Sequence, residues 1–422
     1  MRTLSLFLFL FFVQTVSSQN KLASEYYLLK PDRVFDGEKM HAGWSVLVKG
    51  EKIELVGILQ QIPKNTQIIE LKGCTLMPGL IEGHSHLFLH PYNETSWNDQ
   101  VLNESRTERT IRATVHAKNT LLAGFTTVRD LGTEGAMYDD IGLKKSIEKG
   151  IIPGPRMIVA TRAIVIRGSY GPKSGSADND FPIGAAEVGG MEELSNEIRT
   201  QIGKGADFIK LYADYRWGPD GIAAATFTQD ELNMAVQIAG SSGRVVVAHA
   251  STEEGMRRSI LAGIKTIEHG DGATKEIFDL MKEKGVAFCP TISAGDAIEQ
   301  YRGWKKGSLP EPTRIQQKRK TFKMALAAGV TICMGGDVGV YTHGDNAREI
   351  EAMVDYEMSP LQALQSATSV NADVFGMQNK IGRIKSGLFA DIVVVEGNPS
   401  MTISDIRRIK LVMKGGELVL LK

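Results

Sequence analysis

The hydrophobic pattern alternates between two kinds of segment from about residue 75 to residue 376. Short apolar runs rich in β-branched residues predict strands, and stretches with helical apolar spacing, such as Glu253–Ala262 and Lys275–Lys284, predict helices between them. The strand candidates are Thr75–Ile81, Thr126–Asp130, Arg156–Ala160, Phe208–Tyr212, Val245–His249, Thr266–His269, Val286–Thr291 and Thr331–Gly335. Eight strand–helix units in succession predict an α/β fold, a (β/α)8 TIM-type barrel.

The two ends of the chain have a different pattern. Short strand patterns without intervening helices occur at Trp44–Lys49 and Lys52–Gly57, and again at Asp391–Glu396 and Leu411–Leu421. We therefore expect a small β-sandwich domain formed from both chain ends. The predicted bounds are residues 19–75 and 377–422 for this composite β domain and residues 76–376 for the barrel.

The first 18 residues resemble a targeting segment. One Arg is followed by the apolar run Leu4–Val13 and then by small polar residues, which is typical of a cleavable secretory signal peptide. A membrane anchor is the alternative, but the run has about half of the residues needed to span a bilayer. The sequence predicts a secreted or periplasmic protein whose mature form has no membrane association.

Charge and cysteine content narrow the function classes. Lys and Arg together number 49, as do Asp and Glu, so the chain lacks the basic excess typical of nucleic-acid binding. The three cysteines, Cys74, Cys289 and Cys333, lie in apolar runs, and an odd number cannot form a complete set of disulfides. We interpret them as buried apolar residues rather than redox or metal-binding groups.

Polar residues with metal-binding chemistry follow several predicted strands. The first strand run leads into His84-Ser85-His86, whose two imidazoles face the same side of an extended segment. The complete set is His84, His86, Lys210, His249, His269 and Asp337. Each alone has an ordinary explanation, such as a structural histidine, a lysine reaching solvent or a turn aspartate. Six at matching strand-end positions predict one metal site at the barrel rim.

Three segments carry a family resemblance. Met77–His86 resembles the "PGLID-HxH" opening of the amidohydrolase superfamily, with Glu82 where Asp is usual. Ala123–Asp130 resembles the second strand of that superfamily, and Ser386–Val394 resembles its closing segment. The similarity covers nearly all of the mature chain, and it points to the branch that holds imidazolonepropionase-like and Xaa-Pro dipeptidase-like enzymes.

The resemblance implies a cofactor and roles for the six residues. It implies two divalent metal ions, the first pair of histidines binding one ion and the second pair the other. Lys210 would be carboxylated by CO2 and bridge the ions, and Asp337 would bind the first ion and shuttle the proton. Imidazole and carboxylate ligands favour zinc, with manganese, cobalt and iron left open.

The predicted function is hydrolysis of an amide-type C–N bond, in a dipeptide or N-acyl amino acid, by a metal-bridging hydroxide. Hydrolysis of lactones, carbamates or organophosphates on the same metal core is the main alternative. Imidazolonepropionase-like ring opening is disfavoured, because those enzymes resemble this chain but lack the lysine found at Lys210. A non-catalytic scaffold is disfavoured because all six candidate ligands are present.

Substrate choice depends on loops at the barrel mouth. The dipeptidase relatives tend to have a Gly-Gly-His loop after strand three, whereas this chain has Arg167-Gly168-Ser169-Tyr170. The mouth candidates are Arg162, Arg167, Tyr170, Lys173 and His343. Because guanidinium groups bind carboxylates through paired hydrogen bonds, we expect a small amide or peptide substrate with a free carboxylate. The sequence leaves open whether the chain forms a homo-oligomer.

Overall fold

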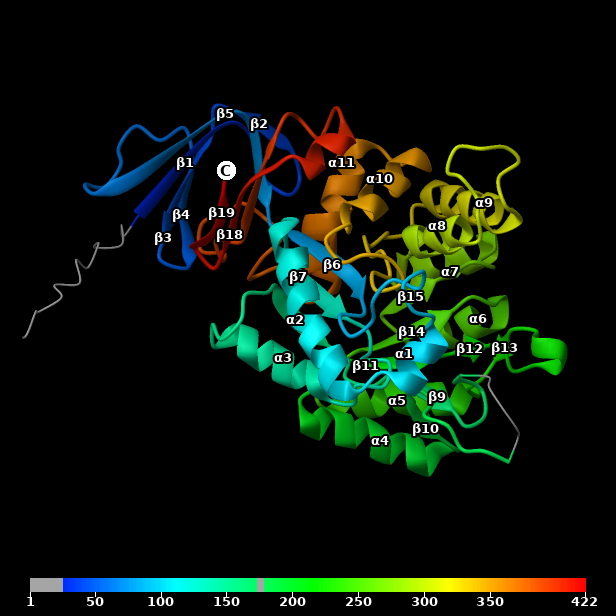
Figure 1. Ribbon diagram of the computed structural model, residues 1–422. Helices are drawn as coiled ribbons and strands as arrows, with labels where there is room; N and C mark the ends of the chain where they lie inside the picture. The colour runs from blue at the N-terminus through cyan, green and yellow to red at the C-terminus, as the bar shows by residue number, and fades with distance from the viewer. Residues whose placement is uncertain (1–25, 173–177) are drawn as a thin grey trace, which may run out of the picture.

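The structure, a computed structural model, describes residues 26–172 and 178–422 (Figure 1). The predicted signal peptide at residues 1–18 and the mouth candidate Lys173 lie outside the described residues, so secretion stays a prediction. Across the part of the chain that is described, no helix combines the length and the apolar character needed to cross a bilayer.

Parallel strands form two arcs in the middle of the chain. The first arc contains β6 (Leu80–Ser85), β7 (Phe125–Asp130) and β8 (Arg156–Val159). The second contains β10 (Ala186–Val188), β9 (Ile164–Ile166), β11 (Ile209–Tyr212), β14 (Val246–Ala250), β15 (Thr266–His269) and β16 (Ala287–Cys289) in spatial order. Each arc faces the helices of its own crossovers, as parallel sheets require.

Hydrogen bonds connect the two arcs at both ends. Between β8 and β11, the Asp207 amide donates to the Val159 carbonyl at 2.8 Å. On the other side, Ile332 bridges Phe288 of β16, and the Gly83 amide of β6 donates to the Met334 carbonyl at 3.1 Å. The chain therefore has the predicted TIM-type barrel architecture.

The segment predicted as the eighth strand, Thr331–Gly335, is not a regular strand. Only an isolated bridge forms at Ile332. Side-chain hydrogen bonds also hold this segment, since Ser366 Oγ donates to the Ile332 carbonyl at 2.8 Å and Asn371 Nδ2 donates to the Met334 carbonyl at 2.7 Å. These bonds could not be seen in the local apolar pattern.

Two other strand predictions had the wrong bounds. The run Thr75–Ile81 is divided at Gly79, where a Cβ would come within 2.1 Å of Thr126 Oγ1, so the chain passes there from the terminal sheet into the barrel. The run Leu411–Leu421 is broken by a turn at Gly415-Gly416. In both places the glycines carry the change of direction that apolar spacing alone does not record.

Both ends of the described chain contribute to one eight-stranded sheet, which lies beside the barrel with its blue and red strands together (Figure 1). Its strands are β1 (Tyr26–Phe35), β2 (Met40–Ala42), β3 (Ser45–Lys49), β4 (Lys52–Gly57), β5 (Thr66–Pro78), β17 (Ile392–Glu396), β18 (Ile409–Lys414) and β19 (Glu417–Leu421). Leu29, Val46, Val394 and Leu411 belong to its buried core. The β-rich domain expected from both ends is thus confirmed, while its sequence bounds stay a prediction.

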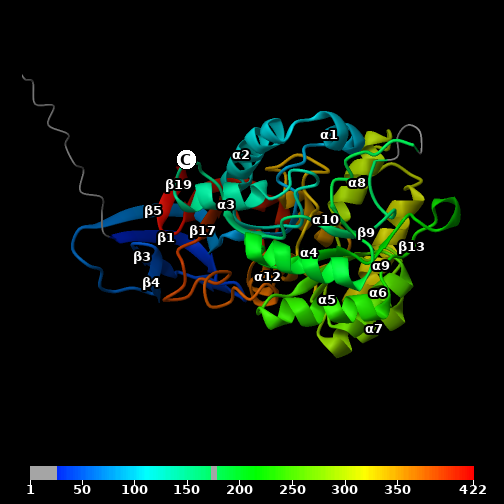
Figure 2. The same ribbon diagram turned by 90° about the horizontal axis from the view of Figure 1, so that it is seen from below.

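Helices surround the barrel strands (Figure 2). They are α1 (Trp97–Asn103), α2 (Arg106–Leu122), α3 (Asp139–Glu148), α4 (Met191–Lys204), α5 (Gln229–Ser241), α6 (Glu253–Ala262), α7 (Lys275–Lys284), α8 (Ile292–Tyr301), α9 (Thr313–Ala328), α10 (Ala347–Asp355), α11 (Pro360–Gln365) and α12 (Asn371–Val374). A small hairpin, β12 (Asp214–Tyr215) with β13 (Ala224–Ala225), projects from the barrel mouth. Left-handed glycines such as Gly263 and Gly285 end helices, as their position before strands predicts.

Candidate metal centre and active-site cavity

The six candidate residues stand on barrel strands or directly after them: His84, His86, Lys210, His249, His269 and Asp337. The histidine rings form a continuous cluster. Ring centroids lie 5.3 Å apart for His84 and His86, 5.1 Å for His84 and His269, and 4.4 Å for His249 and His269. Strand-end placement therefore brings together residues that are up to 253 positions apart in sequence (84 to 337).

Three of these side chains have the spacing of a metal site. Asp337 Oδ1 lies 3.4 Å from His86 Nε2 and 3.6 Å from His84 Nε2, and all three groups offer ligand atoms within 4.8 Å of one another. Ligand atoms bound tetrahedrally to one ion at about 2.1 Å lie about 3.4 Å apart. The donor set and its spacing fit a divalent ion.

Lys210 has no bonding partner for its amino group among the described residues. The side chain is 0 % exposed, and Nζ accepts or donates no hydrogen bond; it lies 5.4 Å from the centre of the Tyr212 ring. Burial lowers the pKa of Lys210 to about 8, against the opposing charges of Glu268 and Asp337. A buried polar group without a partner is costly. The buried, unbonded position of Nζ suits a chemical group joined covalently to that nitrogen.

Three histidines are oriented by hydrogen bonds to the nitrogen that faces away from the centre. Nδ1 lies 2.9 Å from Glu268 Oε2 in His84, 2.8 Å from the Gly132 carbonyl in His86, and 2.8 Å from Thr291 Oγ1 in His269. Bonding at Nδ1 leaves the Nε2 lone pair available to a metal. Burial lowers the pKa of His84 and of His269 well below the usual value, which keeps these rings neutral.

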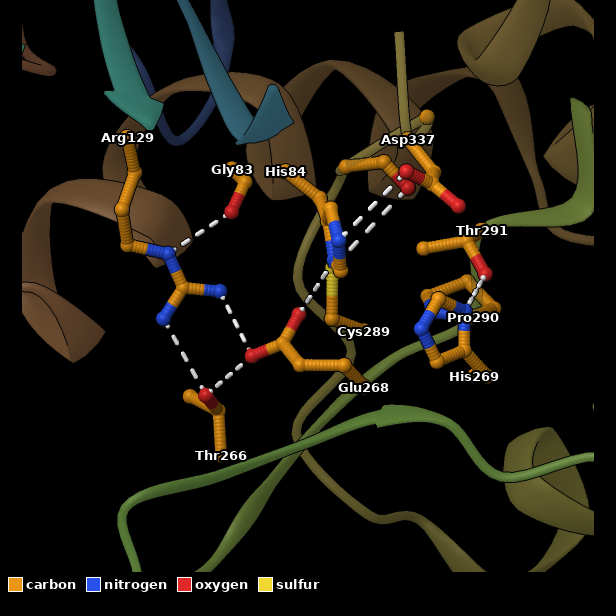
Figure 3. A network of polar contacts seen from close by, with 12 residues as sticks. Gly83, His84, Arg129, Thr266, Glu268, His269, Cys289, Pro290, Thr291 and Asp337 are labelled. Carbon is orange, nitrogen blue, oxygen red and sulfur yellow. Dashed lines mark hydrogen bonds and ion pairs between the residues drawn. The ribbon is translucent and has the colours of Figure 1, made fainter. Parts of the chain in front are cut away.

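Glu268 belongs to a buried network behind His84 (Figure 3). Its carboxylate is 0 % exposed and accepts a hydrogen bond from Arg129 Nη2 at 2.8 Å and one from the Thr266 hydroxyl. Arg129 also donates from Nε to the Gly83 carbonyl at 2.7 Å. The network holds the carboxylate against the imidazole and compensates its charge, so the His84 ring is fixed before any ion binds.

Glu82 connects β6 to the loop that carries Asp337. Its carboxylate accepts hydrogen bonds at 2.9 Å from the amides of His84 and Gly336 and from Asn346 Nδ2. Burial raises the pKa of Glu82 to about 7, with the three donors acting in the opposite direction. The family motif usually has Asp at this position. The longer Glu82 side chain connects β6 with the loop that carries Asp337.

Several residues around the centre have strained backbones. The φ angles of His269, Thr291 and Asp337 are 73°, 48° and 59°, in the left-handed region that non-glycine residues rarely adopt. Each such conformation costs about 1–3 kcal/mol and persists where the surroundings hold it in place. The site therefore keeps a defined geometry at some expense in stability.

A cavity of about 790 Å³ opens above this cluster. His86, His249, His269 and Asp337 line its floor, while His84 and Lys210 lie beneath the surface that it exposes. Its walls are rich in aromatic side chains, namely Tyr92, Trp97, Tyr170, Tyr212, Tyr215 and Tyr301. The cavity is large enough for a small organic substrate in contact with the candidate centre.

Three of the predicted mouth residues do not line this cavity. Arg162 donates to the Ala185 carbonyl at 2.7 Å, and Arg167 forms an ion pair with Glu193 at 2.6 Å. His343 is buried, with Nε2 3.0 Å from the Leu89 carbonyl and its ring stacked on a neighbouring histidine. Only Tyr170 of the described candidates faces the cavity. Other partners hold these three side chains in this structure, and their role in substrate binding stays a prediction.

Sequence reasoning also missed residues that the structure brings to the site. Glu268 immediately precedes His269 and points to the opposite face of β15. The one feature of the sequence that could have indicated its role is an acidic residue within an apolar strand. Arg129 gave a similar signal in β7. Glu134 and Arg314 line the cavity from a loop and from the first turn of α9, where no local pattern marks them.

The chain is similar to known proteins in both sequence and fold. The amidohydrolase family model matches residues 75–419. An ochratoxinase of Aspergillus niger is 30% identical over 421 residues, covering 91% of this chain and 84% of that protein. A Xaa-Pro dipeptidase solved with bound methionine is 32% identical with a TM-score of 0.81, covering 93% of this chain and 99% of that one. A prolidase solved with N-methylphosphonate-L-proline is 27% identical with a TM-score of 0.81, covering 94% and 100%.

Proposed function

The chain belongs to the amidohydrolase family and is a hydrolase of amide C–N bonds, and we propose that it works with two divalent metal ions on a small dipeptide or N-acyl amino acid. The observation that carries the proposal is the convergence of four histidines and Asp337 around Lys210, whose buried amino group has no partner among the described residues. The dipeptidase, prolidase and ochratoxinase relatives add support for the substrate class.

The proposed ligands divide into two sets joined by Lys210. His84, His86 and Asp337 would hold one ion, and His249 and His269 would hold the other. The donor types favour zinc in both positions.

Carboxylation of Lys210 would supply the bridge. The neutral amine adds to CO2 and loses one proton, which gives a carbamate with two oxygen ligands. Burial lowers the pKa of Lys210 to about 8, which makes the neutral amine accessible near neutral pH. The anionic product would also offset the charge of two cations in a buried site.

When bound, the ions would lower the pKa of water to about 7 and polarise the substrate carbonyl. Asp337 would accept the proton of the attacking water and return it to the leaving nitrogen. Its carboxylate faces the cavity, 3.4 Å from His86 Nε2. Burial raises the pKa of Asp337, which suits a group that alternates between accepting and donating a proton.

Arg314 is our candidate for binding a substrate carboxylate, in place of the two arginines suggested by the sequence. Its guanidinium lines the cavity and forms no hydrogen bond or ion pair with the residues that the structure describes, whereas Arg302 on the same wall pairs with Glu299 at 2.9 Å. A Cβ at Gly295 of α8 would lie 3.3 Å from Arg314 Nε, so a glycine there leaves room for the guanidinium.

A substrate panel tests the proposed function. The zinc-loaded protein is assayed with a dipeptide, an N-acyl amino acid, a lactone, a carbamate, a phosphotriester and an imidazolone ring compound. We expect cleavage of the amide substrates, loss of activity on chelation and recovery with zinc. Turnover confined to the lactone, phosphotriester or imidazolone would contradict the proposed substrate class, and turnover that survives complete metal removal would contradict the proposed chemistry.

A further inference from the structure

Besides Asp337 of the candidate metal centre, four carboxylates line the cavity, and they differ in the partners that they have within the chain. The four are Glu134, Asp214, Asp271 and Glu299. Lys318 forms an ion pair with Asp271, and Arg302 pairs with Glu299. Asp214 accepts hydrogen bonds from the amides of Ser251 and Thr252 at 2.8 Å and 2.6 Å. Glu134 forms no ion pair within 4 Å with a Lys or Arg of the described residues, and unlike Asp214 it accepts no hydrogen bond from a backbone amide there.

The contacts of Glu134 come from aromatic side chains. Its Oε2 accepts hydrogen bonds from Tyr170 OH at 2.6 Å and from Trp97 Nε1 at 3.0 Å. Its Oε1 has one long contact, 3.5 Å from Tyr212 OH, so that oxygen keeps unused acceptor capacity. The residue is 2 % exposed and has a φ of 49°, a strained conformation for a glutamate.

Aromatic rings pack closely around this carboxylate. We name Trp97, Tyr170, Tyr212 and Tyr215 the aromatic box; all four line the cavity. The Tyr170 ring centroid lies 5.2 Å from that of Trp97 and 4.8 Å from those of Tyr212 and Tyr215. Burial, together with the nearby Glu134, raises the pKa of Tyr170 well above its usual range, which keeps its hydroxyl protonated as a donor.

This environment favours a cation. Ring faces carry negative potential, and a carboxylate at the edge of the rings adds a full charge, so an ammonium gains from both. Arg109 lies behind the site, but its guanidinium donates to the Phe88 and Thr133 carbonyls at 3.1 Å and 3.0 Å. Its charge therefore offsets that of Glu134 without occupying the cavity side of the carboxylate.

We propose that Glu134 and the aromatic box bind a protonated amine on the acyl side of the substrate. The proposal rests on the proposed amide hydrolysis and selects, between its two substrate types, the peptide with a free α-amine. Glu134 lies in the loop after β7, whereas Arg314 lies in the first turn of α9, which follows β16 and α8. The two side chains, neither of which has an ion-pair partner among the described residues, therefore stand at different positions around the barrel mouth. A substrate with an ammonium at one end and a carboxylate at the other would place its amide between them.

A pair of substrates of equal shape tests this subsite. Alanyl and isobutyryl amides of the same amino acid differ only in an ammonium that replaces a methyl group. With the zinc-loaded enzyme at pH 6.5 we expect kcat/KM to favour the alanyl substrate by at least about tenfold. The preference should decline as the pH rises through the pKa of the α-amine, about 8, because the neutral amine loses its charge.

Variants connect the preference to Glu134. In Glu134→Gln the amide oxygen can still accept from Tyr170 and Trp97, and the alanyl-to-isobutyryl ratio should fall toward 1. Tyr215→Leu, which removes a ring but no hydrogen bond to Glu134, should lower the ratio by about twofold or more. Glu193→Gln is the matched control, since Glu193 pairs with Arg167 outside the cavity, and it should keep the wild-type ratio.

Each outcome is decisive. Equal kcat/KM for the two substrates in the wild-type enzyme, or a wild-type ratio in Glu134→Gln, would overturn the subsite while leaving amide hydrolysis in place. Failure of the enzyme to cleave either substrate would overturn the proposed function itself, and the subsite with it. The wild-type comparison and its pH profile do not depend on the folding of any variant.

Discussion

At the base of the cavity, His84, His86 and His269 are each fixed by a hydrogen bond at Nδ1, whereas near the mouth Arg167 pairs outside the cavity and Arg314 faces it without a partner among the described residues. His84 shows the first arrangement, held at 2.9 Å by Glu268, which is itself held by Arg129. Arg167 and Arg314 show the second, one paired with Glu193 and the other unpaired within the described chain. The difference separates two roles, because a fixed floor supports the reaction and a sparsely bonded mouth supports the choice of substrate.

The largest effect should follow from a change at the floor that removes a reacting group. Asp337→Asn should lower kcat by about 10²–10⁴-fold, because general acid–base catalysis contributes that much and the amide cannot carry the proton. Much of the metal should stay, since the four histidines and Lys210 are unchanged. Steady-state kinetics with metal analysis of the same sample checks this. A loss below tenfold at unchanged metal content would contradict the role of Asp337.

A change one layer behind the floor should have an intermediate effect. Glu268→Gln removes the anionic partner of His84 Nδ1 while keeping the shape of the side chain. Partners of this kind typically account for 10–100-fold in metal affinity or activity, so we expect a loss in that range, measured by chelator competition. Glu253→Gln on the exposed side of α6 is the control, since Glu253 pairs with Arg257 on the same helix. Equal zinc affinity in the two variants would show that the network does not support the floor.

A change at the mouth should have the smallest effect and should depend on the substrate. Arg314→Met should lower kcat/KM for a substrate with a free carboxylate by about tenfold and leave its carboxamide analogue nearly unchanged, because only the carboxylate gains from a charged hydrogen bond. Arg162→Met and Arg167→Met should retain the wild-type preference. If Arg167→Met lost the preference and Arg314→Met kept it, the comparison of the two arginines would be reversed.

The sequence predicted the floor better than the mouth, for a physical reason. His84 near the end of β6 and His86 just after it keep a spacing of two, and His249 and His269 end apolar runs, so local pattern and barrel topology together predict their meeting place. The sequence did not predict the role of Glu268, because that role depends on Arg129, a partner 139 positions away. Local patterns do not encode such pairings.

At the mouth, local sequence pointed to arginines that do not line the cavity, because it could not show where long side chains end. Arg167 belongs to a loop after a strand, as predicted, but Glu193 lies close enough to bind it. Arg314 lies in the first turn of α9, where the local sequence resembles that of an ordinary exposed helix. Its place at the cavity depends on how α9 packs against α8. The barrel and the candidate ligands followed from residue pattern and resemblance, whereas the substrate-facing side chains required the three-dimensional structure.

The proposed centre holds two ions joined through Lys210, and metal stoichiometry tests that claim most directly. Elemental analysis of the wild-type protein, purified from zinc-supplemented medium, should find two transition-metal ions per chain. Lys210→Ala should lose most of that metal, and small carboxylic acids should restore part of the metal and of the activity by replacing the missing bridge. One ion per chain in the wild type, or two ions with full activity in Lys210→Ala, would contradict the account.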